Sequence, residues 1–287
     1  MAGAPAGPYG HPMRIRIVDA FTDRPFAGNP AGVVLLDTGA FPEDDRLQRI
    51  AAEVNLSETA FAHPLPEGAE ADWALRWFTP VTEARMCGHA TLATAHVLGT
   101  TGAATGTVRF ATLSGVLSAT AGDSGMITLD FPTARLTALD VAQDAAGAVV
   151  GALGAEVRSV HQAGPYIDYL VVEVADESAV HRLAPDLTAL ARTGPRGCAV
   201  TAAAEDPARG YDFVSRFFAP ACGIGEDPVT GSAHTALAPF WSARLGRDEL
   251  TGLQASARGG LVRTALRGDR TLLTGAAVTV IEGELLA

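Results

Sequence analysis

Lysine is missing from this chain of 287 residues, and all 21 of its basic residues are arginine. Without lysine the protein has no amine for a Schiff base with pyridoxal phosphate or an aldolase substrate, and no Walker-type phosphate lysine. The 32 acidic residues give a net charge of −11. Because nucleic-acid binding depends on basic side chains that neutralise phosphates, we expect no nucleic-acid partner.

Cysteine is scarce as well, and long apolar runs are lacking. The three cysteines, Cys87, Cys198 and Cys222, are too few for a disulfide framework and form no C-x-x-C pair. No stretch approaches the roughly 18 apolar residues of a membrane-spanning helix. Residues 1–12 are rich in Gly, Pro and Ala, which predicts a disordered start and not a signal peptide. These features predict a cytoplasmic protein with no membrane partner.

Many short strands alternate with a few helices along the chain, which predicts an α+β fold with mixed sheets. Helices are expected at about 42–54, 88–98, 134–155, 185–193 and 233–245, and Asn55 is the expected stop of the first. The expected strands lie at 14–21, 32–36, 56–62, 73–79, 107–112, 115–121, 126–131, 157–161, 167–174, 197–202, 211–218, 260–266, 270–275 and 277–282.

An internal repeat is the most informative pattern in the sequence. Segment 76–80 (RWFTP) matches segment 216–220 (RFFAP), and each precedes a Gly-x-Ala motif, at Gly88 and Gly231, that opens an Ala- and Leu-rich helix. Two copies of one lobe explain the repeat, although an Ala- and Gly-rich chain also produces loose matches by coincidence. The predicted lobes are 1–133 and 134–287. The sequence does not decide to which lobe the last segment, 271–287, belongs, because it could return to the N-terminal sheet.

Each lobe is then expected to direct a helix start toward a cleft between the lobes. The exposed N–H groups and the positive dipole end of such a helix bind anions, most simply a substrate carboxylate. The backbone and hydroxyl groups expected to bind it belong to Gly88, Ala90, Thr230, Gly231 and Ser232. Asn29, Tyr166 and Asp168 are further candidates, from their positions near turns.

The two helix starts also carry side chains that suit catalysis. A thiol at Cys87 would have a lowered pKa beside the helix dipole and His89, but a cysteine is equally often a small buried apolar residue. Asp227 and Ser232 would face His89 across the cleft, although acids and hydroxyls at a helix start also serve as caps. The histidines show no metal-ligand spacing, so no metal is expected.

Glu58 is the candidate proton carrier. It shares a strand face with Leu56 and Ala60, and a partly apolar surrounding raises the pKa of a carboxyl group toward neutrality. The simpler alternative is a solvated glutamate on a strand, which is common in proteins.

Four motifs in order, at 19–35, 55–61, 76–98 and 225–237, resemble those of the phenazine-biosynthesis PhzF-like isomerases, which have the diaminopimelate epimerase-like fold. The resemblance runs from about Arg14 to the end of the chain. It implies two similar lobes, each a curved mixed sheet around a central helix, with a cofactor-free active site in the cleft between them. It also implies a homodimer.

The resemblance further implies roles for single residues. Glu58 falls on the catalytic glutamate that shuttles a proton between carbons of a small carboxylic acid. His89 falls on the histidine that holds the substrate, and Asp227 and Ser232 fall on the other polar positions of the site. Asn29 is counted with the substrate-binding residues because of its position near a turn and not because of the resemblance.

Two rival functions remain open from the sequence. Met86-Cys87-Gly88-His89 also resembles the first cysteine motif of proline racemases and diaminopimelate epimerases, which use two thiols as a base pair. The position of their second cysteine is Pro228 in this chain, so Cys222 would have to substitute for it. The other alternative is a catalytically silent protein that binds a small acid.

Overall fold

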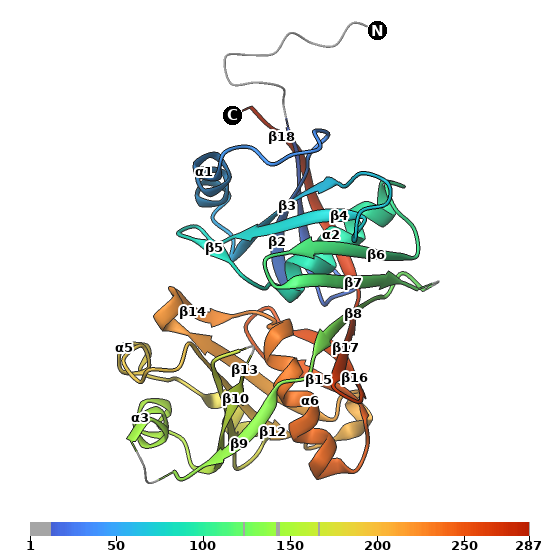
Figure 1. Ribbon diagram of the computed structural model, residues 1–287. Helices are drawn as coiled ribbons and strands as arrows, with labels where there is room; N and C mark the ends of the chain where they lie inside the picture. The colour runs from blue at the N-terminus through green and yellow to red at the C-terminus, as the bar shows by residue number, and fades with distance from the viewer. Residues whose placement is uncertain (1–12, 123, 142–143, 166, 287) are drawn as a thin grey trace, which may run out of the picture. The chain divides into compact units, whose positions relative to one another are not determined.

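The computed structural model describes residues 13–122, 124–141, 144–165 and 167–286 (Figure 1). Residues 1–12, for which the sequence predicts disorder, lie outside that part. The chain divides into two compact units. Unit 1 comprises the described residues of Met1–Leu129 together with those of Ala276–Ala287, and unit 2 comprises those of Asp130–Gly275. Each unit mixes parallel and antiparallel strands with few helices, which confirms the predicted α+β class.

The sheet of unit 1 surrounds one buried helix. Its strands are β1 (Met13–Ala20), β2 (Asn29–Leu35), β3 (Glu58–Pro64), β4 (Trp73–Phe78), β5 (Glu83–Ala84), β6 (Thr107–Thr112), β7 (Gly115–Ala121) and β18 (Ala277–Leu285). β2 runs parallel to β3, β4 runs parallel to β6, and the other pairs are antiparallel.

Helix α2 (Gly88–Thr100) contacts β1, β2, β3, β7 and β18 and is buried along nearly its whole length. An all-round apolar helix of this kind belongs in the middle of a core. Helix α1 (Asp44–Val54) instead buries one stripe, Leu47, Ile50 and Ala51, against β3 and β4. It ends at Asn55 in the left-handed conformation, as the sequence predicts.

Unit 2 has the same pairing scheme around α6 (Gly231–Leu245). Its strands are β9 (Arg135–Leu139), β10 (Val157–Gly164), β11 (Tyr169–Val174), β12 (Gly197–Ala203), β13 (Phe213–Ala219), β14 (Ile224–Asp227), β15 (Glu249–Gln254), β16 (Gly260–Arg267) and β17 (Arg270–Gly275). Here β11 is parallel to β12, and β13 is parallel to β15. The remaining helices are α3 (Asp144–Leu153), α4 (Glu177–Arg182) and α5 (Leu187–Leu190). β8 (Ile127–Pro132) leads from unit 1 into unit 2.

The repeated segments occupy equivalent places in the two units. In unit 1 the Nε of Arg76 donates to Glu83 at 2.7 Å, and its guanidinium lies 5.0 Å from the centre of the Phe78 ring. In unit 2 the Nε of Arg216 donates to Glu226 at 2.7 Å, and its guanidinium lies 5.1 Å from the centre of the Phe218 ring. Matching strand orders and matching ion pairs show that the sequence repeat is a structural repeat.

One strand of each unit, which we call its closing strand, follows in the sequence the strands of the other unit. β18, which follows the last hairpin of unit 2, pairs with β1 in unit 1. β9, which follows the last strand of unit 1, pairs with β10 in unit 2. The two units therefore exchange their closing strands along the sequence.

Two expected helices differ from the structure. The Ala-rich segment 134–155 was expected to be one helix, but residues 135–139 form β9, because their alternating side chains pair with β10. The helix expected at 185–193 is reduced to α5, of four residues. The structure adds α4, whose start is capped by the Asp176 carboxylate accepting from the Ala179 amide. Asn29 opens β2 and does not belong to the turn before it.

Candidate active site

The start of α2 brings together five of the residues that the sequence predicts for the site. Cys87 is the N-cap residue in an extended conformation, and Gly88 is the first helical residue. Asn29 comes from the start of β2 and Glu58 from the start of β3, the two parallel strands on which α2 packs. Strand starts and a helix start therefore converge on His89.

A chain of hydrogen bonds fixes the orientation of His89. The Ser57 hydroxyl donates to Asn29 Oδ1 at 3.2 Å, so the amide nitrogen of Asn29 turns toward His89. That nitrogen lies 3.2 Å from His89 Nδ1. Because an amide nitrogen can only donate, Nδ1 accepts and the ring proton sits on Nε2.

His89 is held in its neutral form. Only 4% of the residue is exposed, and this burial lowers the pKa of the imidazole to about 3. Its buried Nε2 has no hydrogen-bond partner among the described residues. Glu58 Oε2 lies 3.4 Å from this nitrogen, outside hydrogen-bond geometry. A buried polar atom without a partner is costly, which is typical of a group that awaits a ligand.

Glu58 stands at the rim of this buried cluster. It is the first residue of β3, and 13% of its side chain is exposed. Ala60 lies on the same strand face, as expected from the alternation, whereas Leu56 precedes the strand. A carboxylate that is mostly shielded from water and lies beside a neutral imidazole is well placed to exchange a proton with a bound molecule.

Cys87 lies on the other side of the imidazole. Its Sγ is 3.5 Å from His89 Nδ1. One ligand atom from each of Glu58, Cys87 and His89 lies within 4.8 Å of the others, so the three residues could hold a metal ion. The observed contacts use opposite nitrogens of the ring, Nδ1 toward Cys87 and Nε2 toward Glu58. A single ion could bind only one of these two nitrogens.

The start of α6 in unit 2 gathers the other predicted residues. Thr230 is the N-cap residue, and its hydroxyl donates to the Asp227 carboxylate. The Thr230 amide donates to Gln254 Oε1 at 2.8 Å, and the Gln254 amide donates to the Asp227 carbonyl at 2.7 Å. The Thr230 amide is thus already occupied. Gly231 and Ser232, the first two residues of α6, are then the candidates at this helix start for binding an anion.

Sequence reasoning missed three residues of these clusters: Ser57, Gln254 and Tyr169. The Tyr169 hydroxyl lies 3.2 Å from Ser232 Oγ. Of the candidates near turns, Asp168 is exposed and accepts from Gln162, and Tyr166 lies outside the described residues. The available signal for Ser57 was its position directly before Glu58. No sequence signal links Gln254 or Tyr169 to residues 24 and 63 positions away.

Cys222, the thiol considered as a partner of Cys87, belongs to a short 3₁₀ turn and not to a helix start. Its Sγ lies 3.6 Å from the Arg196 carbonyl oxygen.

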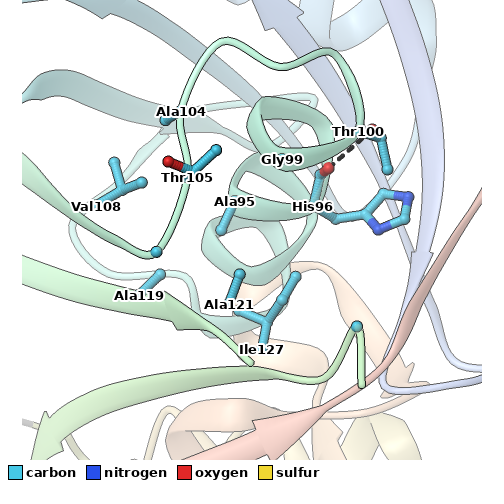
Figure 2. Close-up of a pocket in the computed structure, with 12 residues that line it drawn as sticks. Ala95, His96, Gly99, Thr100, Ala104, Thr105, Val108, Ala119, Ala121 and Ile127 are labelled. Carbon is cyan, nitrogen blue, oxygen red and sulfur yellow. Dashed lines mark hydrogen bonds between the residues drawn. The ribbon is translucent and has the colours of Figure 1, made fainter. Parts of the chain in front are cut away.

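A separate pocket of about 280 Å³ lies along α2, away from the residues described above (Figure 2). Small side chains of α2, β6 and β7 line most of it. His96 borders the pocket, but its ring points away from Val108 and Ala119, and its Nε2 lies 3.1 Å from the Thr279 hydroxyl. With its one titratable group engaged, this pocket offers little chemistry.

None of the helices in the described part of the chain has the length and apolar character that a membrane crossing requires.

Comparisons with known proteins agree on one family. The profile of the phenazine biosynthesis-like proteins, PhzC-PhzF, matches residues 18–283. An uncharacterized isomerase of Pseudomonas aeruginosa is 47% identical over 270 residues, which are 93% of this chain and 96% of that protein. An uncharacterized isomerase of Halalkalibacterium halodurans is 42% identical over 274 residues, 95% of this chain and 98% of that protein.

Solved structures give the fold. A PhzF family protein of Enterococcus faecalis superposes with a TM-score of 0.85 at 37% identity and covers 96% of this chain and 99% of its own. A hydroxyproline epimerase from Agrobacterium vitis shares the fold at 14% identity, with a TM-score of 0.59 over 96% of this chain and 93% of its own. The epimerase-like fold expected from the sequence is thereby confirmed. The chain belongs to the phenazine biosynthesis-like PhzF family and is an isomerase of that family.

Proposed function

We propose that this isomerase moves a proton between two carbons of a small carboxylated substrate without a cofactor, and that Glu58 is the general acid/base that carries the proton. The observation that supports this proposal is the pair formed by Glu58 and His89. The carboxylate lies 3.4 Å from a buried imidazole nitrogen whose ring stays neutral because its pKa is lowered to about 3.

In the proposed reaction the Glu58 carboxylate takes a proton from one carbon of the substrate. The electron pair of the broken C–H bond passes into the adjacent unsaturated system of the substrate. The Glu58 carboxylic acid then gives the same proton to a second carbon, and the carboxylate is restored. His89 is neutral and carries its proton on Nε2, so it donates a hydrogen bond to the substrate without competing for the proton in transit.

The helix-start amides of Gly88 and Ala90 bind the anionic part of the substrate in this proposal. From the family resemblance we further propose that Asp227, Gly231 and Ser232 act on the same substrate, and that the protein works as a cytoplasmic homodimer. Thr230 contributes indirectly, by holding the Asp227 carboxylate.

Proton exchange at carbon tests the assignment of Glu58. The protein is incubated in deuterated buffer with a panel of small unsaturated and amino carboxylic acids, and deuterium incorporation or rearrangement is followed by NMR. Glu58→Gln is expected to lower the rate by about 100-fold or more, as loss of a general base does. Glu53→Gln is the matched control, because Glu53 is an exposed glutamate on α1, and it should keep the wild-type rate.

Cys87→Ser separates this proposal from a thiol mechanism, which the 3.5 Å contact between Cys87 and His89 makes the second candidate. Activity that survives Glu58→Gln and disappears with Cys87→Ser would replace the glutamate shuttle by a thiol base. A panel without any turnover, with tight binding of one of its acids, would instead identify a silent binding protein.

A further inference from the structure

In each unit a strand side chain contacts the second residue of the buried helix. In unit 1 the second residue of α2, His89, is contacted at 3.2 Å by Asn29, the first residue of β2. In unit 2 the second residue of α6, Ser232, is contacted at 3.2 Å by Tyr169, the first residue of β11. β2 and β11 are equivalent strands, since each is the parallel neighbour of the strand that follows it in its sheet.

The register of the sheets shows why unit 2 uses a tyrosine. Thr59 pairs with Phe78, and Cys198 pairs with the repeat-equivalent Phe218. The residues one position earlier, Glu58 and Gly197, are therefore equivalent. Ala31 pairs with Glu58 and Tyr169 pairs with Gly197, so Tyr169 holds the position of Ala31, two residues beyond that of Asn29. Unit 1 places its catalytic candidate there, whereas unit 2 places a residue without a side chain.

The space over Gly197 is filled by Tyr169. A Cβ added at Gly197 would lie 2.9 Å from Cδ1 of Tyr169 and would overlap the Phe217 ring. Phe217 packs edge-on against Tyr169, with ring centres 4.8 Å apart. The glycine and the phenylalanine together fix the tyrosine ring, so that its hydroxyl reaches Ser232.

We propose that Tyr169 is a positioning residue, which donates to Ser232 Oγ and thereby directs the Ser232 hydroxyl proton toward an anionic oxygen of the substrate. This inference deepens the proposed function and rests on it for the identity of the ligand, a small carboxylate. Tyr169 does for Ser232 what Asn29 does for His89: it occupies the acceptor of the group, so that the proton of that group points onward.

The protonation state of Tyr169 agrees with this role. Burial, opposed by the hydrogen bond with Ser232 and assisted by the Asp227 charge, raises the pKa of the phenol to about 12. Tyr169 therefore keeps its proton and remains a donor throughout the range in which enzymes work.

A double-mutant cycle measures the coupling of Tyr169 to Ser232. Binding of benzoate, a carboxylate without an exchangeable carbon-bound proton next to its carboxyl group, is measured by calorimetry or NMR for the wild type, Tyr169→Phe, Ser232→Ala and the double variant. Tyr169→Phe is expected to raise the Kd about 3- to 10-fold, the effect of one misdirected hydrogen bond. In the Ser232→Ala background the same change should alter the Kd by less than about 1.5-fold, because the group it positions is gone.

Tyr211→Phe is the matched control. It removes a hydroxyl from another tyrosine of unit 2, one that donates to Glu177, and it should leave the Kd for benzoate unchanged. The proposal is overturned if Tyr169→Phe has no effect, if its effect is the same with and without Ser232, or if the wild type binds no benzoate. Deuterium exchange that is insensitive to Glu58→Gln, together with an intact cycle, would contradict the proposed function and leave this inference standing.

Discussion

His89 owes its behaviour to a neighbour that lies 60 positions away in the sequence. Burial makes the imidazole neutral, but burial alone does not choose between its two tautomers. The choice comes from Asn29, whose own amide is oriented by Ser57. A single amide thus decides whether the atom facing Glu58 carries a proton.

Asn29→Asp tests this control with a side chain of nearly the same shape. A carboxylate at position 29 accepts a hydrogen bond where the amide donated one, so the ring proton should move to Nδ1 and the pKa of His89 should rise. We expect turnover to fall at least about 10-fold, because Nε2 no longer donates. The ¹⁵N chemical shifts of the imidazole report the tautomer. Asn55→Asp, at the exposed end of α1, controls for the added charge.

An unchanged tautomer in Asn29→Asp, with wild-type turnover, would contradict the role given to Asn29. A changed tautomer with wild-type turnover would show instead that the Nε2 proton takes no part in the reaction.

Sequence reasoning reached the single residues of the site unevenly. Cys87, His89, Thr230 and Ser232 could be placed at helix starts, because Gly-x-Ala before an apolar run marks the beginning of a buried helix. Their contacts could not be predicted. Asn29 was a candidate without a known partner and Tyr169 was missed, because both belong to strands whose neighbours are set by the sheet pairing. Periodicity predicts a strand but not which residue it will face.

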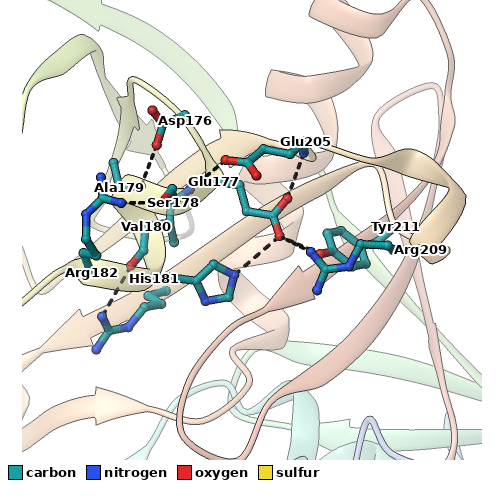
Figure 3. A network of polar contacts seen from close by, with 11 residues as sticks. Asp176, Glu177, Ser178, Ala179, Val180, His181, Arg182, Glu205, Arg209 and Tyr211 are labelled. Carbon is teal, nitrogen blue, oxygen red and sulfur yellow. Dashed lines mark hydrogen bonds and ion pairs between the residues drawn. The ribbon is translucent and has the colours of Figure 1, made fainter.

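Among the elements, α4 depends on one buried carboxylate. Glu177 is 2% exposed and accepts hydrogen bonds from Tyr211 at 2.6 Å, from Arg209 at 3.0 Å and from the Glu205 amide at 2.8 Å (Figure 3). Burial by itself raises the pKa of Glu177, but these donors outweigh it and lower the pKa below its usual value. The carboxylate fastens the start of α4 to the segment that precedes β13.

Glu177→Gln keeps the size of this side chain and removes its charge. We expect it to lower the free energy of unfolding by about 2–3 kcal/mol, because hydrogen bonds to a buried charge are lost and the donors are left unsatisfied. Chemical denaturation at pH 7 measures the change. Glu205→Gln, an exposed carboxylate that accepts from the Ser178 amide at 3.3 Å, should cost less than about 1 kcal/mol.

The cost of Glu177→Gln should shrink in acid. The lowered pKa means that Glu177 contributes stability above the pKa of an unfolded glutamate, about 4.3, and loses it as the pH falls through the folded value. A cost that stays constant down to pH 3 would show that packing, not charge, carries the effect.

At this scale the sequence predicted best where the signal is local. The stop of α1 at Asn55 and the strands of the first unit follow from capping and alternation. The sequence did not predict β9, because it lies in an Ala-rich segment whose composition favours a helix. It did not predict α4, because six residues are too few to show a period. The Asp176 cap was the one local sign of α4.

Across the whole molecule, buried histidines make stability depend on pH. Burial lowers the pKa of His89 to about 3 and that of His234 to about 4. An unfolded histidine takes up a proton below about pH 6.5, whereas these two stay neutral in the folded protein. The unfolded state therefore binds more protons in acid, and stability present above pH 6.5 is lost progressively as the pH falls toward 4.

His234→Asn should reduce this slope. Each such histidine contributes up to about 1.4 kcal/mol per pH unit between the folded and the unfolded pKa. Urea denaturation from pH 7.5 to pH 5, with the cost of the substitution at pH 7.5 subtracted, should give a shallower decline for the variant. An identical slope in both proteins would mean that His234 takes up a proton in the folded protein as readily as in the unfolded chain, so that its pKa is not lowered by folding.

The exchange of closing strands sets the order in which the two units can complete their sheets while the chain is synthesised on the ribosome. A nascent chain that ends near residue 133 has β1 paired with β2 alone, since its second neighbour, β18, is not yet synthesised. Such an open strand edge invites pairing with other chains. Unit 2 holds β9 from the outset and has all its strands by Gly275. The half that is translated second is thus the first to be finished, and the half that is translated first waits for the end of synthesis.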